Sequence, residues 1–432
     1  MLDTFQAFTS ASLWSSLTSK INSYAKESGL VQRISEHFCP HGFLLSLLGA
    51  VSTGRASINQ LASSVGEGMP CLQISVQALQ QRFARTECGV ESFLIRCLSH
   101  ICQWKYLHLS GHAECPFARI IIEDSTFVRF PKSNAIEFPA SGNASGATAG
   151  CKVDLAFDLL SGDVIDNELH LGTESDNAIG VDLLSLIREN DLLLRDMGYF
   201  GVESFIVIEA LNAFWLSRLP LTADAVDMHG VPLEKLLKLH KWNVLDIKVK
   251  LTDKAHPVRL VAIRTSVEES TKRRREYRAK AKQKGKAVPK RTLIRAGWHL
   301  MVTNVPKEML SSHKLAEIYS QRWMIEIVFR AWKQAGNLSK ALNRTTSPQH
   351  LKALVLAGMI AMSISLKIGV AIARKHPDQR YSLEKIFDYI ISRLVNLKNL
   401  CDIAKFKPDL RHLRGQNRTR KSLDLRLLEL LG

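Results

Sequence analysis

Three things are scarce in this sequence: paired cysteines, long apolar runs and acidic residues relative to basic ones. Its eight cysteines are scattered without a repeating pair, which argues against a disulfide framework and against a zinc site with four protein ligands. The first ten residues, MLDTFQAFTS, lack the basic and then apolar order of a signal peptide. The most apolar run, 353–366, is shorter than the roughly 20 residues that cross a bilayer. We therefore expect a cytoplasmic protein with reduced thiols and a buried helix at 353–366.

The balance of charge is strongly basic. Lys and Arg number 58 against 41 Asp and Glu, a formal net charge of +17, and such an excess favours a polyanionic partner. Residues 272–295 alone hold twelve Lys and Arg and one Glu, and twelve minus one is +11 of that total. A run of like charge is usually a solvated loop, so we predict a basic loop here, disordered in the free protein and able to clamp phosphates. Its first four cations are Lys272, Arg273, Arg274 and Arg275.

Hydrophobic periodicity divides the chain into regions. A length of 432 residues allows two domains, or one domain with a large insertion. Residues 1–110 consist of short amphipathic segments separated by polar turns, which predicts an all-helical N-terminal domain. Residues 376–432 are basic and predict a helical C-terminal region, either for nucleic-acid binding or for a dimer contact.

The middle of the chain changes to a strand-rich pattern. Residues 118–130, ARIIIEDSTFVRF, contain a branched apolar run typical of a buried strand. After a Gly/Ser/Ala-rich loop at 140–150, the pattern predicts two more strands, a helix, a strand, a helix and a strand, ending at 218. This order resembles a ribonuclease-H-like domain, so we assign 111–218 to the first part of an α/β catalytic domain.

Two further regions complete this domain. Residues 219–305 alternate in polarity and predict a β-rich insertion that carries the basic loop. Residues 306–375 return to helical spacing and form the second part of the catalytic domain. The predicted fold class is therefore α/β: a ribonuclease-H-like domain interrupted by a β-rich insertion, between helical N- and C-terminal regions.

The stretch 318–334, IYSQRWMIEIVFRAWKQ, mixes charged residues with tryptophans and branched aliphatics. We interpret it as one amphipathic helix with about 100° of rotation per residue. A face of this kind is usually only solvated, but one acid among three bases and a phenol also suits a phosphate backbone. Five polar side chains fall within about 80° of one another: Tyr319, Arg322, Glu326, Arg330 and Lys333.

Three acids from separate elements are suited to hold metal ions. Asp124 ends a predicted central strand, Asp196 ends a second one, and Glu326 lies on the polar helix face. Transfer of a phosphodiester by two metal ions needs carboxylates that converge in this way. We prefer Asp124 to Glu123 because side chains alternate across a strand. Residues of equal chemistry that spacing alone does not exclude are Asp154, Asp158 and Asp166.

The order Tyr319, two residues, Arg322, three residues, Glu326, six residues, Lys333 resembles the Y-R-E-K signature of DDE transposases of insertion sequences (family four). EDSTF around Asp124 and RDMGYF around Asp196 resemble the first and second acidic motifs of that family. The β-rich insertion also lies where the family has one. A departure is Met197, which stands where many relatives carry a basic residue.

The resemblance implies roles for individual residues. Asp124, Asp196 and Glu326 would be the catalytic metal ligands for two Mg²⁺ ions, with Mn²⁺ able to substitute. Trp298 resembles a family tryptophan that stacks on a flipped base, although an apolar strand follows it and packing in the core is the alternative. The residues implied to contact DNA, together with those from the polar face and the basic loop, are Tyr319, Arg322, Lys333, Arg330, Arg218, Trp298, Lys272, Arg273, Arg274 and Arg275.

The implied function is cleavage of double-stranded DNA at the inverted-repeat ends of an insertion sequence, followed by joining of the 3′ ends to target DNA. Implied partners are these ends, the target DNA and a second copy of the chain in the DNA complex, with no membrane and no small-molecule substrate. The N-terminal helices would bind the ends, and the protein would be nucleoid-associated. Two alternatives stay open: a nuclease of the same fold that does not transfer strands, and a catalytically silent repressor derived from a transposase.

Overall fold

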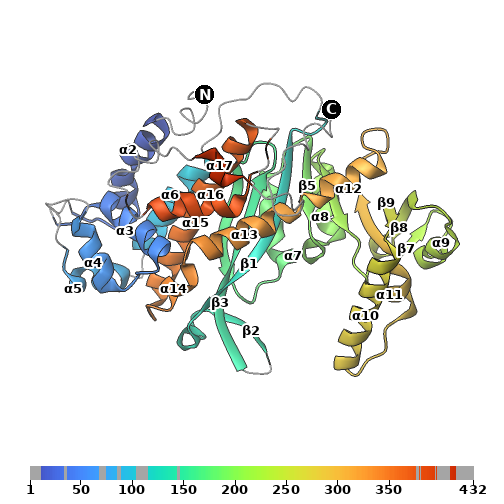
Figure 1. The fold of residues 1–432 in the computed structure, drawn as a ribbon, viewed down its shortest axis with the longest axis horizontal. Coiled ribbons are helices and arrows are strands. Elements are labelled where there is room, and N and C mark those ends of the chain that lie inside the picture. Colours follow the sequence, from blue (N-terminus) through green and yellow to red (C-terminus); the bar gives the residue numbers. More distant parts are fainter. Residues whose placement is uncertain are drawn as a thin grey trace. The chain divides into compact units, whose positions relative to one another are not determined.

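The computed structural model describes residues 11–33, 37–67, 74–84, 89–103, 115–143, 146–375, 379, 381–394, 396 and 409–414. The chain is mixed α/β (Figure 1) and divides into two compact units. The first unit draws on the described residues within 1–111, 125–174 and 323–426, and the second on those within 112–124 and 175–322. The chain passes between the units within strand β1 (Arg119–Phe130), after Asp124, and again after Glu174 and after Arg322.

The first unit begins with five described helices, as the periodicity predicts. Local signals explain where they start and stop. Ser57 and Gln60 each bond the other's backbone N–H with a side-chain oxygen, at 3.3 and 3.2 Å, and so cap the third of these helices. Gly54 ends the second in the left-handed region, φ 71°. The helices are α2 (Ala11–Glu27), α3 (Pro40–Thr53), α4 (Ile58–Glu67), α5 (Val76–Ala84) and α6 (Gly89–Gln103).

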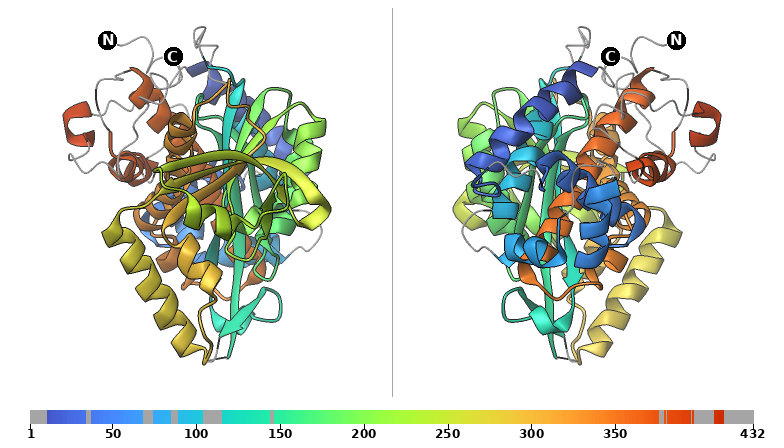
Figure 2. Two further views of the ribbon diagram at one scale, coloured as in Figure 1. Left: turned by 90° about the vertical axis from the view of Figure 1, so that its right-hand side faces the viewer. Right: turned by 90° about the vertical axis from the view of Figure 1, so that its left-hand side faces the viewer.

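Helix α15 (Pro348–Lys375) lies at the centre of the first unit, packed against α3, α6 and α16 (Leu383–Leu394). Figure 2 shows the N-terminal helices in blue beside it. Its segment Pro348–Ile372 is long and apolar enough for a membrane span by length and composition, but the most apolar stretch is entirely buried in protein. The prediction of a buried helix at 353–366 is therefore confirmed. The unit's other C-terminal helices are α13 (Trp323–Ala335), α14 (Leu338–Leu342) and α17 (Leu410–Leu413).

The strands of the first unit differ from the prediction at one place. Of the residues 140–150 that we expected to form a loop, 140–143 and 146–150 instead belong to two paired antiparallel strands, β2 (Pro139–Asn143) and β3 (Gly146–Asp158). A small residue also lets β3 approach β1 closely, because a Cβ at Gly150 would collide with the carbonyl oxygen of Val128 on β1. Strand β4 (Val164–Leu171) then pairs antiparallel with β3.

The second unit contains the rest of the predicted order. The first half of β1 pairs in parallel with β5, which pairs in parallel with β6. Together with β3 and β4 of the first unit, the chain follows the predicted sequence of strands and helices. The bounds are α7 (Asp176–Asp182), η2 (Leu183–Leu186), β5 (Asp191–Arg195), η3 (Met197–Tyr199), α8 (Val202–Ala210) and β6 (Phe214–Arg218).

The predicted β-rich insertion extends the same unit. From β6 onward the strands are antiparallel, in the order β6, β10, β9, β8 and β7. The last inserted strand thus returns to pair with β6, so the insertion is continuous with the parallel strands β1, β5 and β6. Its elements are β7 (Ala225–Asp227), α9 (Leu233–Leu239), β8 (Val244–Leu251), η4 (Asp253–Ala255), β9 (His256–Arg264), α10 (Val267–Gln283), α11 (Lys290–Arg295) and β10 (Trp298–Thr303).

The predicted basic loop at 272–295 was wrong, because helices α10 and α11 occupy most of it. Ser266 caps α10 by accepting a hydrogen bond from the backbone of Glu269, and acids fill its first turn. Glu269 also pairs with Arg273 one turn later, at 2.6 Å. Lys and Arg are good helix formers, so charge density alone misidentified this segment as irregular.

The predicted single helix at 318–334 was also wrong. Helix α12 (Ser312–Ser320) ends before Gln321 and Arg322, and α13 starts at Trp323. The backbone N–H groups of Gln321 and Arg322 bond the carbonyls three residues back, at 3.0 and 3.1 Å, which tightens the end of α12. Hydrophobic periodicity predicts the amphipathic pattern, but it does not predict the break in the helix at Gln321 and Arg322.

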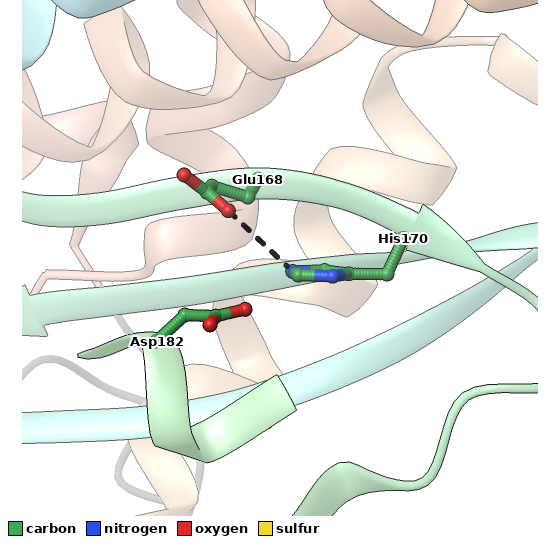
Figure 3. Close-up of side chains that lie close together, drawn as sticks. All are labelled: Glu168, His170 and Asp182. Atoms are coloured by element: carbon green, nitrogen blue, oxygen red, sulfur yellow. Dashed lines mark ion pairs between the residues drawn. The ribbon is translucent and has the colours of Figure 1, made fainter. Parts of the chain in front are cut away.

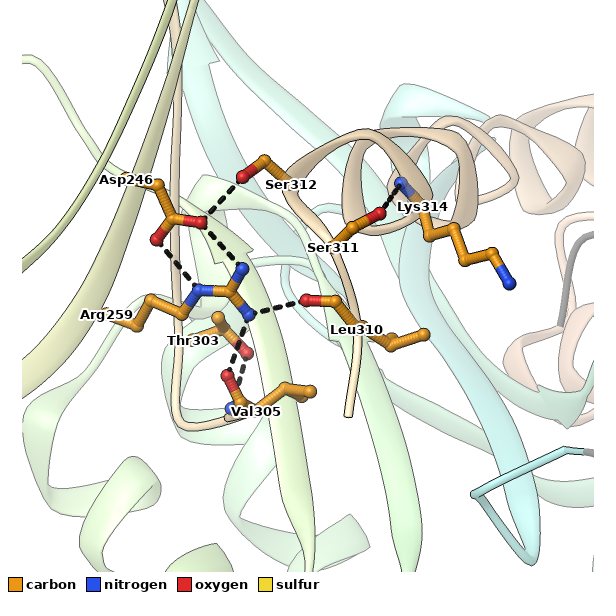
Figure 4. Close-up of polar contacts among 8 residues, drawn as sticks. All are labelled: Asp246, Arg259, Thr303, Val305, Leu310, Ser311, Ser312 and Lys314. Atoms are coloured by element: carbon orange, nitrogen blue, oxygen red, sulfur yellow. Dashed lines mark hydrogen bonds and ion pairs between the residues drawn. The ribbon is translucent and has the colours of Figure 1, made fainter. Parts of the chain in front are cut away.

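A buried ion pair anchors the start of α12 to the insertion (Figure 4). Arg259 of β9 makes two hydrogen bonds to Asp246 of β8, at 2.9 and 2.8 Å, and donates to the carbonyls of Val305 and Leu310. Ser312 donates to the same carboxylate at 2.6 Å. Burial raises the pKa of Asp246, but the hydrogen bonds from Arg259 and Ser312 outweigh it and the pKa is lowered.

Candidate active site

Two of the predicted metal ligands directly follow the last paired residues of two neighbouring parallel strands. Parallel strands β1 and β5 are paired up to Glu123 and Arg195, and Asp124 and Asp196 are the next residues on each. Their side chains are 20% and 36% exposed, so both carboxylates reach solvent. The prediction that Asp124 ends its strand was wrong, because β1 continues to Phe130. The two carboxylates instead lie where the parallel pairing of β1 with β5 stops.

Arg322 contacts both of these carboxylates. Its Nη1 lies 3.2 Å from Oδ2 of Asp124 and its Nε 3.8 Å from Oδ1 of Asp196, and its own side chain is only 13% exposed. The turn between α12 and α13 places it there. A residue that we expected to bind phosphate thus neutralises two predicted metal ligands in the free protein.

Tyr319 and Arg218 belong to the same cluster. The hydroxyl of Tyr319 donates to the carbonyl of Arg195 at 3.3 Å, directly before Asp196. Burial raises the pKa of Tyr319 far above its usual value and nearby Asp196 adds to the effect, while the charges of Arg322 and Arg218 oppose it. Tyr319 is therefore a neutral hydrogen-bond donor, with two cations close to its ring.

Glu326 and Lys333 lie in the first unit, on α13. Glu326 is half-buried in the first turn of the helix, where a negative charge is favourable. Lys333 donates to Oγ1 of Thr126 and to the carbonyl of Phe127 on β1, at 2.7 and 2.8 Å. Its expected place on an exposed face was wrong, because the side chain is half-buried against β1.

Arg330 also engages protein rather than solvent alone. It pairs with Glu384 of α16 at 3.6 Å, and its guanidinium lies 6.0 Å from the ring centre of Trp323. Its charge is thus partly used to hold α13 against α16 within the first unit.

Trp298, expected to stack on a base, is only 4% exposed. The guanidinium of Arg264 lies 4.3 Å from the centre of its ring, and the ring of His240 lies 6.1 Å away. In the free protein this side chain packs inside the insertion and an arginine occupies one ring face. The base-stacking role stays a prediction that requires this packing to open.

The four basic residues at the start of the expected loop are not equivalent. Arg273 bonds Glu269 and the carbonyl of Trp298 on β10, and Arg274 bonds the carbonyl of Leu293 on α11, so both hold α10 against its neighbours within the insertion. Lys272 and Arg275 are exposed. Only the second pair presents its charge outward.

The other candidate acids have local roles or lie elsewhere. Asp158 accepts hydrogen bonds from the backbone N–H of Leu160 and of Ser161 and so closes the turn after β3. On β4 the carboxylate of Glu168 lies 3.9 Å from Nε2 of His170 (Figure 3); neither residue is among the predicted ligands, and Asp182 in the same picture belongs to the second unit.

The sequence reading missed one pair beside the predicted site. Glu123 and Arg195 are 0% and 1% exposed, and Nε of Arg195 donates to Oε2 of Glu123 at 2.6 Å. The signal was present, since each charged residue follows an apolar run and directly precedes a predicted catalytic aspartate. The alternation of side chains along a strand explains why Glu123 faces away from Asp124. It does not identify Arg195 as the partner of Glu123.

Comparison with known families places this architecture in a class. Residues 116–364 match the family model of the transposase DDE domain. This span covers more than half of the chain, so the chain belongs to the transposase DDE domain family and is an enzyme that acts on DNA. Enzymes of this family generally use divalent metal ions.

Individual relatives are transposases of insertion sequences. The chain is 26% identical to the transposase for insertion sequence element IS231F of Bacillus thuringiensis subsp. israelensis, across 73% of this chain and 71% of the relative. It is 26% identical to that of IS231C from subsp. berliner, across 87% and 83%, and 24% identical to that of IS1151 from Clostridium perfringens, across 73% and 70%. The resemblance to insertion-sequence transposases is confirmed at this level, and the roles of single residues stay predictions.

Proposed function

We propose that this transposase cleaves DNA at the inverted-repeat ends of its own insertion sequence and joins the 3′ ends to target DNA by two-metal-ion phosphoryl transfer. The catalytic residues of the proposal are Asp124, Asp196 and Glu326. We further propose that the mixed α/β chain contains a ribonuclease-H-like domain from 111–218 and 306–375, interrupted by the insertion 219–305. Residues 1–110 would bind the DNA ends, and 376–432 would form a basic C-terminal region.

The observation that carries the proposal is the placement of Asp124, Asp196 and Arg322. Two partly exposed carboxylates directly follow the paired segment of adjacent parallel strands and are close enough to share one guanidinium. Carboxylate oxygens are the protein ligands that Mg²⁺ prefers, and a cation already lies between them. The donor set therefore fits divalent metal, with Glu326 from α13 as the third proposed ligand.

The metal ions, Mg²⁺ or Mn²⁺, would activate the attacking hydroxyl and stabilise the leaving oxygen. The residues of the chain would orient the DNA. Arg322 makes charge-assisted contacts that a phosphate oxygen can replace, since a guanidinium binds phosphate and carboxylate with the same geometry. Tyr319, kept neutral by burial, would donate its hydroxyl proton in a hydrogen bond to the backbone near the reacting bond.

Other cations would hold the flanking DNA. Lys333, Arg330 and Arg218 would contact phosphates near the cleaved end, and the exposed Lys272 and Arg275 of α10 would contact phosphates farther away. The partners of the proposal are the terminal inverted repeats, the target DNA and a second copy of the chain in the DNA complex. A nucleoid-associated protein in the cytoplasm is the setting consistent with these partners.

The test is product analysis on a plasmid that carries the genomic DNA flanking both sides of the reading frame. With Mg²⁺ we expect cuts at short inverted repeats, followed by joined or hairpinned products, and no products from Asp196→Asn. Cuts without any joining would instead identify a nuclease. If Asp124→Ala left every activity of the chain unchanged, the reading as a silent repressor would replace the proposal.

A further inference from the structure

A buried ion pair lies next to Asp124 and Asp196, the two aspartates of the proposed site that belong to the second unit. Glu123 and Arg195 are opposite one another in the register of β1 and β5, and each immediately precedes an aspartate of the proposed site. Both are almost completely buried, at 0% and 1% exposure, and their side chains meet at 2.6 Å. Burying two charges is costly unless they are paired and further hydrogen-bonded, so the position of this pair calls for a reason.

Arg195 contacts several elements near Asp196 in this unit. Its Nη2 donates to the carbonyl of Gly180 on α7, and its guanidinium lies 5.6 Å from the ring centre of Tyr199 on η3. Its backbone carbonyl accepts from Tyr319 of α12. One residue therefore ties β1, α7, η3 and α12 to the end of β5.

The packing around the guanidinium is tight. A Cβ at Gly180 would lie 2.6 Å from Cδ1 of Tyr199 and 3.1 Å from Nη2 of Arg195. Tyr199 itself is 1% exposed. The guanidinium thus has little room to shift, and neither has the strand end that carries it.

We propose that Arg195, through Glu123, is a positioning residue that sets the separation of Asp124 and Asp196 and the placement of Tyr319. The inference rests on the proposed function, since it assigns a role toward metal ligands. Side-chain alternation supports separate roles for a buried pair and for the two aspartates. Glu123 and Arg195 face the interior, while the next residue after each reaches solvent. Residues that orient metal ligands typically change metal affinity or activity by about 10- to 100-fold when they are replaced.

If the pair of Glu123 and Arg195 served only to stabilise the fold, replacing it would change stability and metal binding together. An apolar pair of similar size often replaces a buried ion pair without loss of stability. The double variant Glu123→Leu with Arg195→Met should therefore fold as well as the wild type. It removes the hydrogen bonds to β1 and α7, so the aspartates lose their fixed spacing while the core stays filled.

The experiment compares thermal unfolding with Mn²⁺ binding in the full chain bound to its DNA end. Mn²⁺ is followed by electron paramagnetic resonance, and the Mn²⁺ bound by the Asp196→Ala complex is subtracted. The matched control is Arg295→Met, because Arg295 is also a buried arginine, 2% exposed, that bonds one carboxylate, Glu234, and backbone carbonyls, but on α11 in the insertion.

We expect the double variant to unfold at the wild-type temperature, to bind Mn²⁺ about 10- to 100-fold more weakly, and to need correspondingly more Mn²⁺ for cleavage. Arg295→Met should lower the unfolding temperature without changing Mn²⁺ affinity. Wild-type Mn²⁺ affinity in the folded double variant, or an affinity that only follows the unfolding temperature across all variants, would overturn the inference. If Asp196→Ala binds Mn²⁺ and cleaves like the wild type, the proposed function itself fails.

Discussion

Lys333→Ala separates a structural role from a DNA-binding role. We expect this variant to lose both stability and end cleavage, because Lys333 bonds Thr126 and Phe127 of β1 in the free protein. A solvated position on the polar helix face would lead to loss of cleavage with an intact fold. The contacts of Lys333 with β1 change the expectation for the fold.

The magnitude follows from the contacts. A hydrogen bond from a charged donor contributes about 1.5–3 kcal/mol, and Lys333 makes two, at 2.7 and 2.8 Å. Burial opposes the charge, as the lowered pKa of Lys333 shows, and the half-exposed position allows water to replace part of the loss. We expect the free energy of unfolding to fall by about 2 kcal/mol in total. In a unit of this size, that loss lowers the unfolding temperature by about 4–8 °C.

The assay is thermal unfolding alongside cleavage of the DNA end, with three variants. Lys333→Gln keeps a hydrogen-bond donor without the charge, so it should recover part of the stability and none of the phosphate binding. Lys132→Ala, at an exposed lysine that follows β1 in the first unit, should change neither quantity. An unchanged unfolding temperature in Lys333→Ala would show that the contacts to β1 contribute nothing, and normal cleavage would remove the proposed role at the phosphate.

Three further predictions concern other residues. Replacing Lys272 and Arg275 with Gln should reduce the slope of log affinity against log salt by up to about 1.8, whereas an unaltered slope would mean that α10 does not touch DNA. Trp298→Ala should lower the free energy of unfolding by about 3–5 kcal/mol, while full stability with lost cleavage would favour base stacking over packing. Burial lowers the pKa of His350 from 6.5 to about 4, so only the unfolded chain takes up this proton between those values; stability should fall by about 3 kcal/mol as the pH drops from 6.5 to 4, and a His350→Leu variant with the same pH slope would contradict this.

Periodicity predicted most of the elements because each has a long apolar face. The five N-terminal helices, the buried α15 and the order of strands from β1 to β6 all follow from patterns that a single segment carries. The two failures in the helices have local causes. Charge density concealed the good helix formers of α10, and an amphipathic face continues through the turn at Gln321 and Arg322 although the backbone does not.

Pairing between distant residues was the part that the sequence could not supply. That Arg322 would contact Asp124, 198 positions away, or that Lys333 would bond β1, depends on the packing of elements that periodicity only identifies one at a time. The same holds for Glu123 and Arg195, whose partnership exists only because β1 and β5 are neighbours. Motif spacing pointed to the candidate residues, and the structure adds which protein groups engage them before DNA arrives.

The central claim is that three acids, far apart in the chain, act together on DNA through metal ions. The most direct measurement is end cleavage with Mg²⁺ by Asp124→Asn, Asp196→Asn and Glu326→Gln, each first shown by thermal unfolding to be folded. We predict that every one of the three variants, while still binding the DNA end, produces no cleavage. Cleavage at the wild-type rate by any one of them would contradict the account.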